Sequence, residues 1–428
     1  MLKRKTSTLL ITSFVLWIRP AAGADVEDLY RVFQTPPRSE SLMPYWFWNG
    51  DISAAESRRQ MREMIGQGVH QAVVFPWGGM GVRYLSEEYW QQVGAALDAA
   101  KKLGFTLNFA DEYFWPSGHA WEESSNQPEM SRVLQAHPEF RMRRLKSSEQ
   151  IVAGPTNWSW QAATNLELAV AAREESNGGL APDSCTNLTS SGGRFAWSVP
   201  AGRWVVTVYQ LVPAVGSHNA RVDLLNPAAT RVYLDMVYEE YARRFPQHLG
   251  TTLKLTVADH EGAYGAAIAW TPRLWQEFQA RKGYDLRRLL PLLTRPSADG
   301  AFGRRVRQDY FEVISALYAE GFMQPVTAWC SRHGLQHAAS LYEEQFCFQV
   351  KDGGDMFQNW RSGTAVFMDA LIERARMPID FKEAVSVAHF DRKPLLVENQ
   401  GLQGHATFFS LEKARLGSNM ALLWGANR

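Results

Sequence analysis

Short, unbroken apolar runs that end in carboxylates recur along the chain. The run that begins at Leu253 ends in Asp259, His260 and Glu261, and the run 394–397 ends in Glu398. Because helices cover both faces of a parallel sheet, its strands lack the alternation of polar and apolar residues seen in half-exposed strands. The pattern therefore predicts buried parallel strands with acidic side chains at their carboxyl ends.

Segments with a helical period separate these runs, and the alternation of strand and helix at short spacing is typical of βαβ units. The predicted fold is α/β, a (β/α)8 TIM-like barrel with an inserted all-β subdomain and an incomplete last barrel unit. Helices are expected at 53–65, 87–104, 226–245, 271–283 and 305–333. Strands are expected at 44–51, 68–75, 105–112, 253–261, 336–344, 377–380, 393–398 and 419–424.

Four segments follow from these patterns. A basic start, an apolar core at 9–18 and the small residues 22–24 predict a signal peptide over 1–24. The first part of the barrel is expected at 25–129 and its remainder at 216–428. Between them, the short alternating runs and turn residues of 130–215 predict the β-rich insertion. The chain ends inside or just after the expected eighth strand, so the last unit of the barrel is expected to be incomplete.

The signal peptide predicts a secreted or periplasmic protein, and no later stretch is apolar for long enough to span a membrane. The net charge is +1 and no basic stripe is present, so nucleic acid is not expected as a partner. The three cysteines have no C-x-x-C spacing, and the absence of clustered Cys and His ligands argues against zinc. The sequence leaves the oligomeric state and any disulfide pairing open.

Carboxylates at strand ends favour one reaction class. Hydrolysis of a glycosidic bond needs one carboxyl group to protonate the leaving oxygen and a second to activate water or attack the anomeric carbon. The chain also has 16 Trp, whose flat apolar faces suit sugar rings as well as large cores. The acidic candidates at strand ends are Asp111, Glu112, Asp259, Glu261, Glu343, Glu344 and Glu398.

Several motifs together resemble glycoside hydrolase family 106, the α-L-rhamnosidases. They are Trp-Phe-Trp-Asn at 46–49, Asp-Glu-x-x-Trp-Pro-Ser-Gly at 111–118, Asp-x-Glu at 259–261 followed by Trp-Thr-Pro, Arg-Lys-Gly-Tyr-Asp-Leu at 281–286, and Ala-His-x-x-x-Lys-Pro-x-x-x-Glu at 388–398. The resemblance implies a calcium-dependent, inverting exo-enzyme with a carbohydrate substrate and two catalytic glutamates. By position these match Glu261, as general acid, and Glu398, as base, although the order of the two roles is open.

Further residues are candidates for substrate binding, each with a structural alternative. Asp111 and Glu112 bind sugar hydroxyls or calcium, or else stabilise the turn near Trp115. Trp46, Trp48 and Trp77 stack on sugars or pack in the barrel core. The other candidates are Asp259, His260, Tyr342 and Glu344. The calcium ligands are not assigned.

A second reading of the sequence is a non-catalytic carbohydrate-binding barrel, or a fragment of a larger hydrolase. A third is a hydrolase that uses the same scaffold on another glycoside, because pocket loops rather than the fold decide which sugar is bound.

Overall fold

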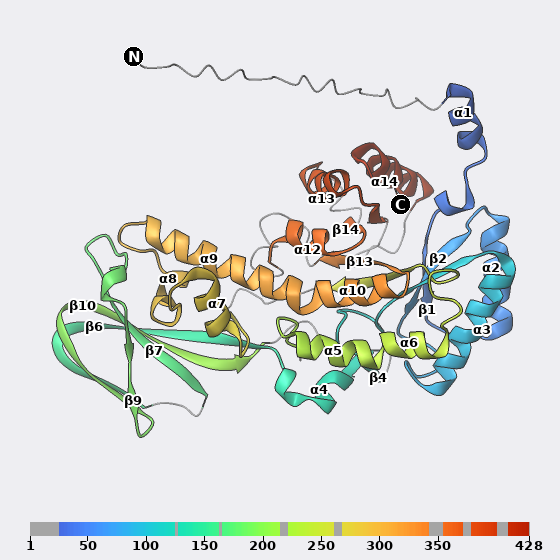
Figure 1. Ribbon diagram of the computed structural model, residues 1–428. Coiled ribbons are helices and arrows are strands. Elements are labelled where there is room, and N and C mark those ends of the chain that lie inside the picture. The colour runs from blue at the N-terminus through green and yellow to red at the C-terminus, as the bar shows by residue number, and fades with distance from the viewer. Residues whose placement is uncertain are drawn as a thin grey trace, which may run out of the picture.

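The structure is a computed structural model that describes residues 25–124, 127–161, 165–214, 221–260, 268–341, 354–370, 378–399 and 410–427. It is a mixed α/β molecule. A barrel-like wall of parallel strands with outer helices lies at one end, and a β-rich sheet lies at the other (Figure 1). No described helix is long and apolar enough to cross a membrane.

Five parallel strands form the main part of the wall, in the order β1-β2-β3-β11-β13. β14 and β15 form a second parallel pair. The amide of Thr364, just before β14, donates to the carbonyl of His337 in β13 over 3.0 Å, which joins the two groups. The strands are β1 (Tyr45–Trp48), β2 (Gln71–Pro76), β3 (Thr106–Ala110), β11 (Leu255–His260), β13 (Gln336–Leu341), β14 (Val366–Ala370) and β15 (Leu395–Asn399).

Side chains from these strands converge in one inner core. Successive residues of a strand point to opposite faces, so alternate positions of each strand reach the interior while the others face the helices. The inner cluster takes residues from six strands and one adjoining position, namely Val73, Phe75, Ala110, Leu255, Val257, Ala338, Ala365, Phe367 and Leu396. The wall therefore curves around a packed interior, as in a barrel.

Helices connect the strands and lie outside the wall, as Figure 1 shows for α2 and α3 beside β1 and β2. The side chains of Ser53 and Ser86 cap the first turns of α2 and α3, and Gly104 ends α3 in the left-handed conformation. The helices around the wall are α2 (Ala54–Gly66), α3 (Glu87–Leu103), α5 (Pro227–Met236), α6 (Tyr238–Arg244), α9 (Ala301–Tyr318), α10 (Gln324–Arg332), α12 (Met356–Ser362), α13 (Pro378–Asp391) and α14 (Leu411–Trp424).

Two of the expected strands are wrong. The segment 419–424 belongs to α14, and 377–380 overlaps the start of α13; the sixth strand is β14. A short apolar run fits a buried strand and a buried helix equally well, and the strong helix formers at 411–416 favour a helix here. The other expected strands and helices of the wall are confirmed, and no ladder joins β15 to β1 in the described part of the chain.

The β-rich sheet is built on one long antiparallel hairpin. β6 pairs with β10 from Arg143 opposite Pro213 to Gln161 opposite Arg194, with an irregularity between Val199 and Gly202. The sheet has the order β12-β6-β10-β7-β8, and β9 pairs with β10. Its strands are β6 (Arg143–Gln161), β7 (Leu166–Arg173), β8 (Thr186–Leu188), β9 (Ser190–Ser191), β10 (Arg194–Pro213) and β12 (Ile268–Trp270). The sheet thus takes one strand from beyond the 130–215 range.

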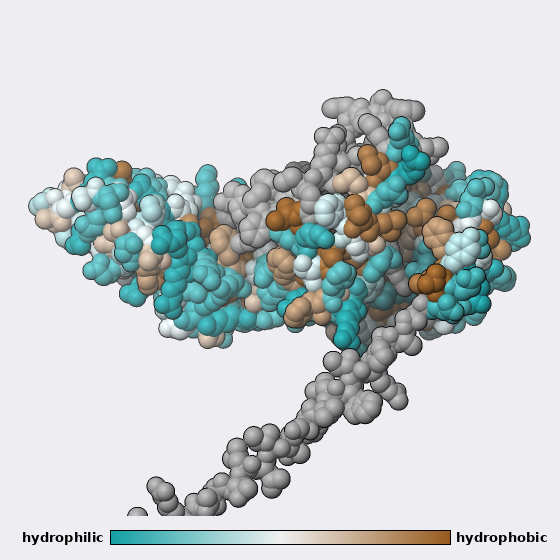
Figure 2. Space-filling model, turned by 90° about the horizontal axis from the view of Figure 1, so that it is seen from above, coloured by the Kyte–Doolittle hydropathy of each residue, from teal (hydrophilic) through white to brown (hydrophobic). Residues whose placement is uncertain are grey.

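The two ends of the molecule differ in surface character. On the face seen in Figure 2, the end that carries the β-rich sheet is mostly hydrophilic, whereas hydrophobic residues gather over the barrel end. Smaller elements complete the fold: α1 (Val26–Gln34), β4 (Trp121–Ser124), β5 (Gln127–Ser131), α4 (Arg132–Ala136), α7 (Leu274–Lys282) and α8 (Pro291–Thr294).

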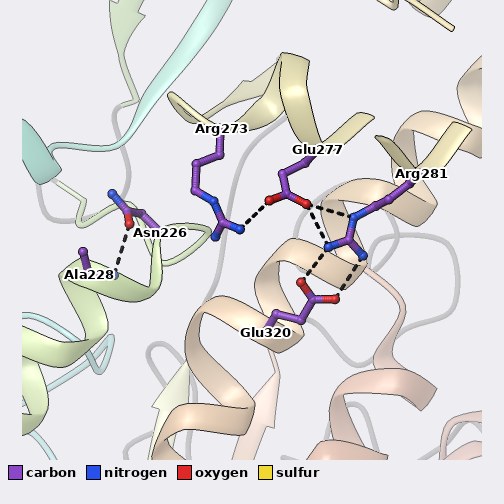
Figure 3. Close-up of polar contacts among 6 residues, drawn as sticks. All are labelled: Asn226, Ala228, Arg273, Glu277, Arg281 and Glu320. Carbon is purple, nitrogen blue, oxygen red and sulfur yellow. Dashed lines mark hydrogen bonds and ion pairs between the residues drawn. The ribbon is translucent and has the colours of Figure 1, made fainter. Parts of the chain in front are cut away.

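A continuous helical rod runs from α9 through a π-helical turn, Ala319–Met323, into α10. Its π-helical turn is held on two sides. Arg281 of α7 donates two hydrogen bonds to Glu320, of 3.0 and 2.7 Å, and also pairs with Glu277 (Figure 3). Gly321 lies so close to the segment before α5 that a Cβ added there would be 2.3 Å from the carbonyl oxygen of Leu224.

The substitution Gly321→Ala is expected to lower the free energy of unfolding by roughly 1–3 kcal/mol, because the added methyl group overlaps backbone that has no room to move. Urea denaturation measures the difference. Gly66→Ala is the matched control, since nothing lies within 4 Å of the added Cβ at the end of α2. A loss of stability in the control as large as that of Gly321→Ala would contradict the close-approach explanation.

Candidate active site

Acidic side chains from four strands lie at the carboxyl end of the barrel wall. Asp111 directly follows β3, Asp259 lies near the end of β11, Asp369 near the end of β14, and Glu398 near the end of β15. Within the ladders, Asp369 stands opposite Glu398 and Asp259 stands opposite Ser340. The carboxyl ends of parallel strands form the face of an α/β barrel at which active sites lie.

Two serines connect carboxylates at this face. Ser117 donates to Asp111 Oδ1 over 2.5 Å, and its hydroxyl oxygen accepts the amide of Asp259 over 3.0 Å. Ser340 of β13 donates to Asp259 Oδ1 over 2.9 Å. The loop after β3 is thereby fixed to β11, and β11 to β13, by groups at the level of the site.

Asp111 and Glu112 are both buried and both bonded within the protein. Tyr238 donates to Asp111 Oδ2 over 2.6 Å, while burial raises the pKa of Asp111 to about 6. The two oxygens of Glu112 accept the backbone amides of residues 113, 119, 120 and 121 at 2.7–3.1 Å. Burial raises the pKa of Glu112 to about 8, and the amides act in the opposite direction. These contacts favour the turn-stabilising alternative for both carboxylates.

Glu398 differs from those two residues because its side chain is half-buried and faces other acids. Burial raises the pKa of Glu398 well above its ordinary value, and the negative charges of Asp259 and Asp369 add to the shift. A like charge nearby disfavours ionisation, so Glu398 holds its proton to higher pH than an exposed glutamate does. Acid–base hydrolysis of a glycosidic bond requires two carboxyl groups with different pKa values.

The two tryptophans of β1 face away from this site. Trp48 is fully buried, with its ring edge-on to Tyr89 of α3, and the indole N–H of Trp46 donates to Gln60 of α2 over 2.7 Å. This favours the core-packing alternative for both. The alternate positions of β1 point the other way: Tyr45 packs against the inner core, and Phe47 stacks on Phe75 of that core.

An aromatic cluster at the ends of β2 and β3 was not identified as a unit from the sequence. Trp77 stacks on Phe114 with ring centroids 4.2 Å apart, and Phe114 stacks on Trp115 at 4.1 Å. All three side chains are partly exposed. A stacked, partly exposed aromatic surface at the site face is the type of surface on which sugar rings pack.

Asp369 and Ser340 were also missed. The apolar run that ends in Asp369 has the same form as the run that ends in Glu398, but placing the sixth strand too late in the chain hid this signal. Glu261, Tyr342 and Glu344 lie outside the described residues, as does the side chain of His260. Their expected roles stay predictions.

Calcium also stays a prediction of the family resemblance. Within the described ranges, no three or more His, Cys, Asp or Glu side chains are grouped so that they could hold a metal ion. Asp111 and Glu112, the carboxylates considered for this role, already use their oxygens for bonds within the protein. The described residues therefore offer no ready ligand set for a cation that prefers six to eight oxygens.

Comparison with known proteins extends these observations. The family model of glycoside hydrolase family 106, α-L-rhamnosidase, matches residues 145–428. The chain belongs to glycoside hydrolase family 106. This match covers most of the chain and includes both Asp259 and Glu398.

This chain is similar to the structure of a rhamnosidase from Novosphingobium sp. PP1Y, with a TM-score of 0.66 at 15% sequence identity. The similarity covers 94% of this chain and 56% of that one, so the chain spans little more than half the length of that rhamnosidase. The catalytic domain of a β-amylase from Paenibacillus polymyxa matches with a TM-score of 0.45 at 11% identity, over 91% of both chains. No curated protein sequence matches.

Substitution of Glu112 separates a structural role from substrate binding. Glu112→Gln places an amide NH2 against backbone N–H donors, so we expect the free energy of unfolding to fall by roughly 2–3 kcal/mol, as measured by urea denaturation. Glu88→Gln, at an exposed position in the first turn of α3, is the control and should lower stability by less than about 1 kcal/mol, because it loses only exposed contacts at the helix N-terminus. A Glu112→Gln protein with unchanged stability and a raised KM would instead support the predicted role in substrate binding.

Proposed function

We propose that this protein is an exported α-L-rhamnosidase that removes terminal α-L-rhamnosyl residues from poly- or oligosaccharides with inversion, using Glu261 and Glu398. The observation that carries the proposal is the position of Glu398: a carboxyl held at the carboxyl end of a family 106 barrel wall, among carboxylates that shift its pKa. Export rests on the signal peptide predicted for 1–24.

In the proposed reaction, Glu261 protonates the glycosidic oxygen while Glu398 removes a proton from the attacking water. An inverting site needs about 6.5–9.5 Å between the two carboxyl groups, so that the water fits between the base and the sugar. A base acts best when its pKa is close to the working pH. The raised pKa of Glu398 makes it a stronger base than an exposed glutamate, provided that the pH is high enough for it to be ionised.

The neighbours of Glu398 have supporting roles in this scheme. Asp259 is held by Ser340 and Ser117, so its negative charge stays at a fixed place beside the site. Asp369 is in register with Glu398 on the adjacent strand. Both charges stabilise the cationic character that develops at the anomeric carbon. The stacked surface of Trp77, Phe114 and Trp115 is available for the apolar face of a sugar ring.

Glu261→Gln and Glu398→Gln should each reduce kcat for an aryl α-L-rhamnoside by about 10²–10⁴-fold, because each removes one acid–base step. Circular dichroism and thermal unfolding establish that the variants are folded, and Glu88→Gln should retain wild-type kcat. Wild-type rates in both Gln variants would reject the assignment of the pair.

Two kinetic tests on these variants, one with a better leaving group and one with added azide, show which glutamate is the acid and which is the base. Loss of the acid should matter least for a dinitrophenyl rhamnoside, whose leaving group needs no proton. Loss of the base should be partly rescued by azide, which attacks without being deprotonated. We expect the first behaviour for Glu261→Gln and the second for Glu398→Gln; the opposite results would exchange the two roles.

The calcium prediction is tested with the same substrate. Incubation of the wild-type protein with a chelator should reduce kcat at least about tenfold. Added Ca²⁺, but not Mg²⁺, should restore it, because Ca²⁺ binds larger and more flexible sets of oxygen ligands than Mg²⁺ does. Full activity in the chelator would show that the chain hydrolyses rhamnosides without the cation. An absence of turnover from folded wild-type protein in the presence of Ca²⁺ would contradict the proposed function.

A further inference from the structure

The loop after β3 interrupts a ladder of hydrogen bonds and returns to it at Ser117. The amide of Asp111, which directly follows β3, donates to the carbonyl of Val257 in β11 over 2.9 Å. In a regular parallel ladder the second residue after Asp111 would make the following bond, to Asp259. Instead the amide of Ser117 donates to the carbonyl of Asp259 over 2.8 Å. Residues 112–116 are therefore inserted between two successive bonds of one ladder.

The hydroxyl of Ser117 closes this loop at its base. It donates to Asp111 Oδ1 over 2.5 Å and accepts the amide of Asp259 over 3.0 Å, so it joins the two ends of the loop to each other and to β11. Ser117 is fully buried, and Tyr238 donates to the other carboxylate oxygen of Asp111. Without the hydroxyl, the amide of Asp259 and the carboxylate of Asp111 would each lose a bond in a buried place, where polar groups need partners.

The loop carries two of the three rings of the aromatic surface formed by Trp77, Phe114 and Trp115. Phe114 has a backbone φ of 65°, the left-handed conformation, which costs free energy in residues other than glycine and persists only where the surroundings hold it. Its amide donates to the carbonyl of Pro76 at the end of β2 over 3.1 Å, and the rings of Trp115 and Trp77 are 5.2 Å apart. Bonds to β2 on one side and, through Ser117, to β11 on the other thus hold a strained backbone of the kind found at functional sites.

We propose that Ser117 is a positioning residue for sugar binding, because it holds the loop with Phe114 and Trp115 at a fixed place beside β11. The use of the aromatic surface for sugar rests on the proposed function. A sugar ring that stacks on aromatic rings while its glycosidic bond lies at the carboxylates must meet both at once, so its affinity depends on their separation. Ser117 is bonded both to the start of the loop and to the residue of β11 that brings a carboxylate, Asp259.

Ser117→Ala should raise KM for an aryl α-L-rhamnoside roughly 3–10-fold and change kcat by less than about twofold. KM rises because part of the stacking contact, which is made in the ground state and the transition state alike, is lost. kcat changes little because Ser340 still donates to Asp259 Oδ1, so that charge keeps its place. Ser117→Cys keeps a side chain of similar size with a weaker donor. It should raise KM by a smaller factor, and it replaces the alanine variant if that variant does not fold.

Ser131→Ala is the matched control, since it also removes a buried serine hydroxyl with one donated and one accepted bond. That hydroxyl donates to the carbonyl of His119 over 3.0 Å and accepts the amide of Leu134 in α4 over 3.2 Å, so it does not bond to β11. Ser131→Ala should lower the melting temperature as Ser117→Ala does and leave KM unchanged. An equal rise of KM in both variants would reveal a general effect of lost stability and would overturn the proposed role of Ser117.

A double-mutant cycle with Trp115→Ala tests how the effect reaches the substrate. Trp115→Ala alone should raise KM, because it removes one ring of the aromatic surface. If Ser117 acts by placing that ring, Ser117→Ala adds less than about twofold to KM in the Trp115→Ala background, since residues that act as a unit are not additive. The same factor in both backgrounds, or a wild-type KM in Ser117→Ala, would contradict this role.

A measurement without turnover separates the role of Ser117 from the proposed function. Hydroxyl-radical labelling followed by mass spectrometry reports the exposure of Trp115. Labelling should rise at least about twofold in Ser117→Ala and stay at the wild-type level in Ser131→Ala, because only the first change loosens the loop at β11. Equal labelling of Trp115 in the wild type and Ser117→Ala would overturn the proposed role whatever the substrate. If the wild type neither binds nor hydrolyses a rhamnoside but labelling rises only in Ser117→Ala, the proposed function fails and Ser117 still holds the aromatic surface.

Discussion

Concentration of negative charge at one end of a parallel wall is the constraint on which the rest of this structure depends. Strands that run in the same direction bring their carboxyl ends to one face, and here four of them bring an acid with them. In a site partly removed from water, like charges repel strongly and each carboxylate loses hydration. The donors around the carboxylate differ from position to position, and these differences separate Asp111 and Glu112, which are bonded within the protein, from Glu398, which is proposed for catalysis.

Glu112 is surrounded by amides and Asp111 by hydroxyl groups, so both are occupied in holding the loop after β3. Asp259 is partly satisfied by Ser340. Glu398 receives the repulsion of its neighbours, and its proton is held more tightly as a result. The same kind of side chain thus serves two purposes at one face, and the donors around it decide which.

The strands of the wall were largely predictable from the sequence, because buried parallel strands leave a strong signal in unbroken apolar runs. The run 394–397 and the run before Asp259 both became strands where expected. Helix α14 was not predictable in this way, since the mostly apolar residues 419–424 suit a buried strand as well as a helix. The sequence also did not show which face of β1 each residue occupies. Trp46 and Trp48 were predicted to bind sugars because of their chemistry, whereas the pleat of β1 turns both outward and Tyr45 inward. Hydrogen bonds from residues 119–121 to Glu112 depend on how a loop folds back, which spacing along the chain does not encode.

The strand β12 has a consequence for Glu261. β11 ends at His260 in the barrel wall, and β12, which begins at Ile268, pairs with β6 in the β-rich sheet. The segment that carries the proposed acid is therefore attached at one end to the wall and at the other to a different sheet, with seven residues (261–267) between the two attachments. Any change in the distance between these sheets alters the span that those residues must cover. The β-rich sheet thus holds one end of the segment that carries the proposed acid, and substitutions at the pairing of Ile268 with Leu145 can change where that end lies.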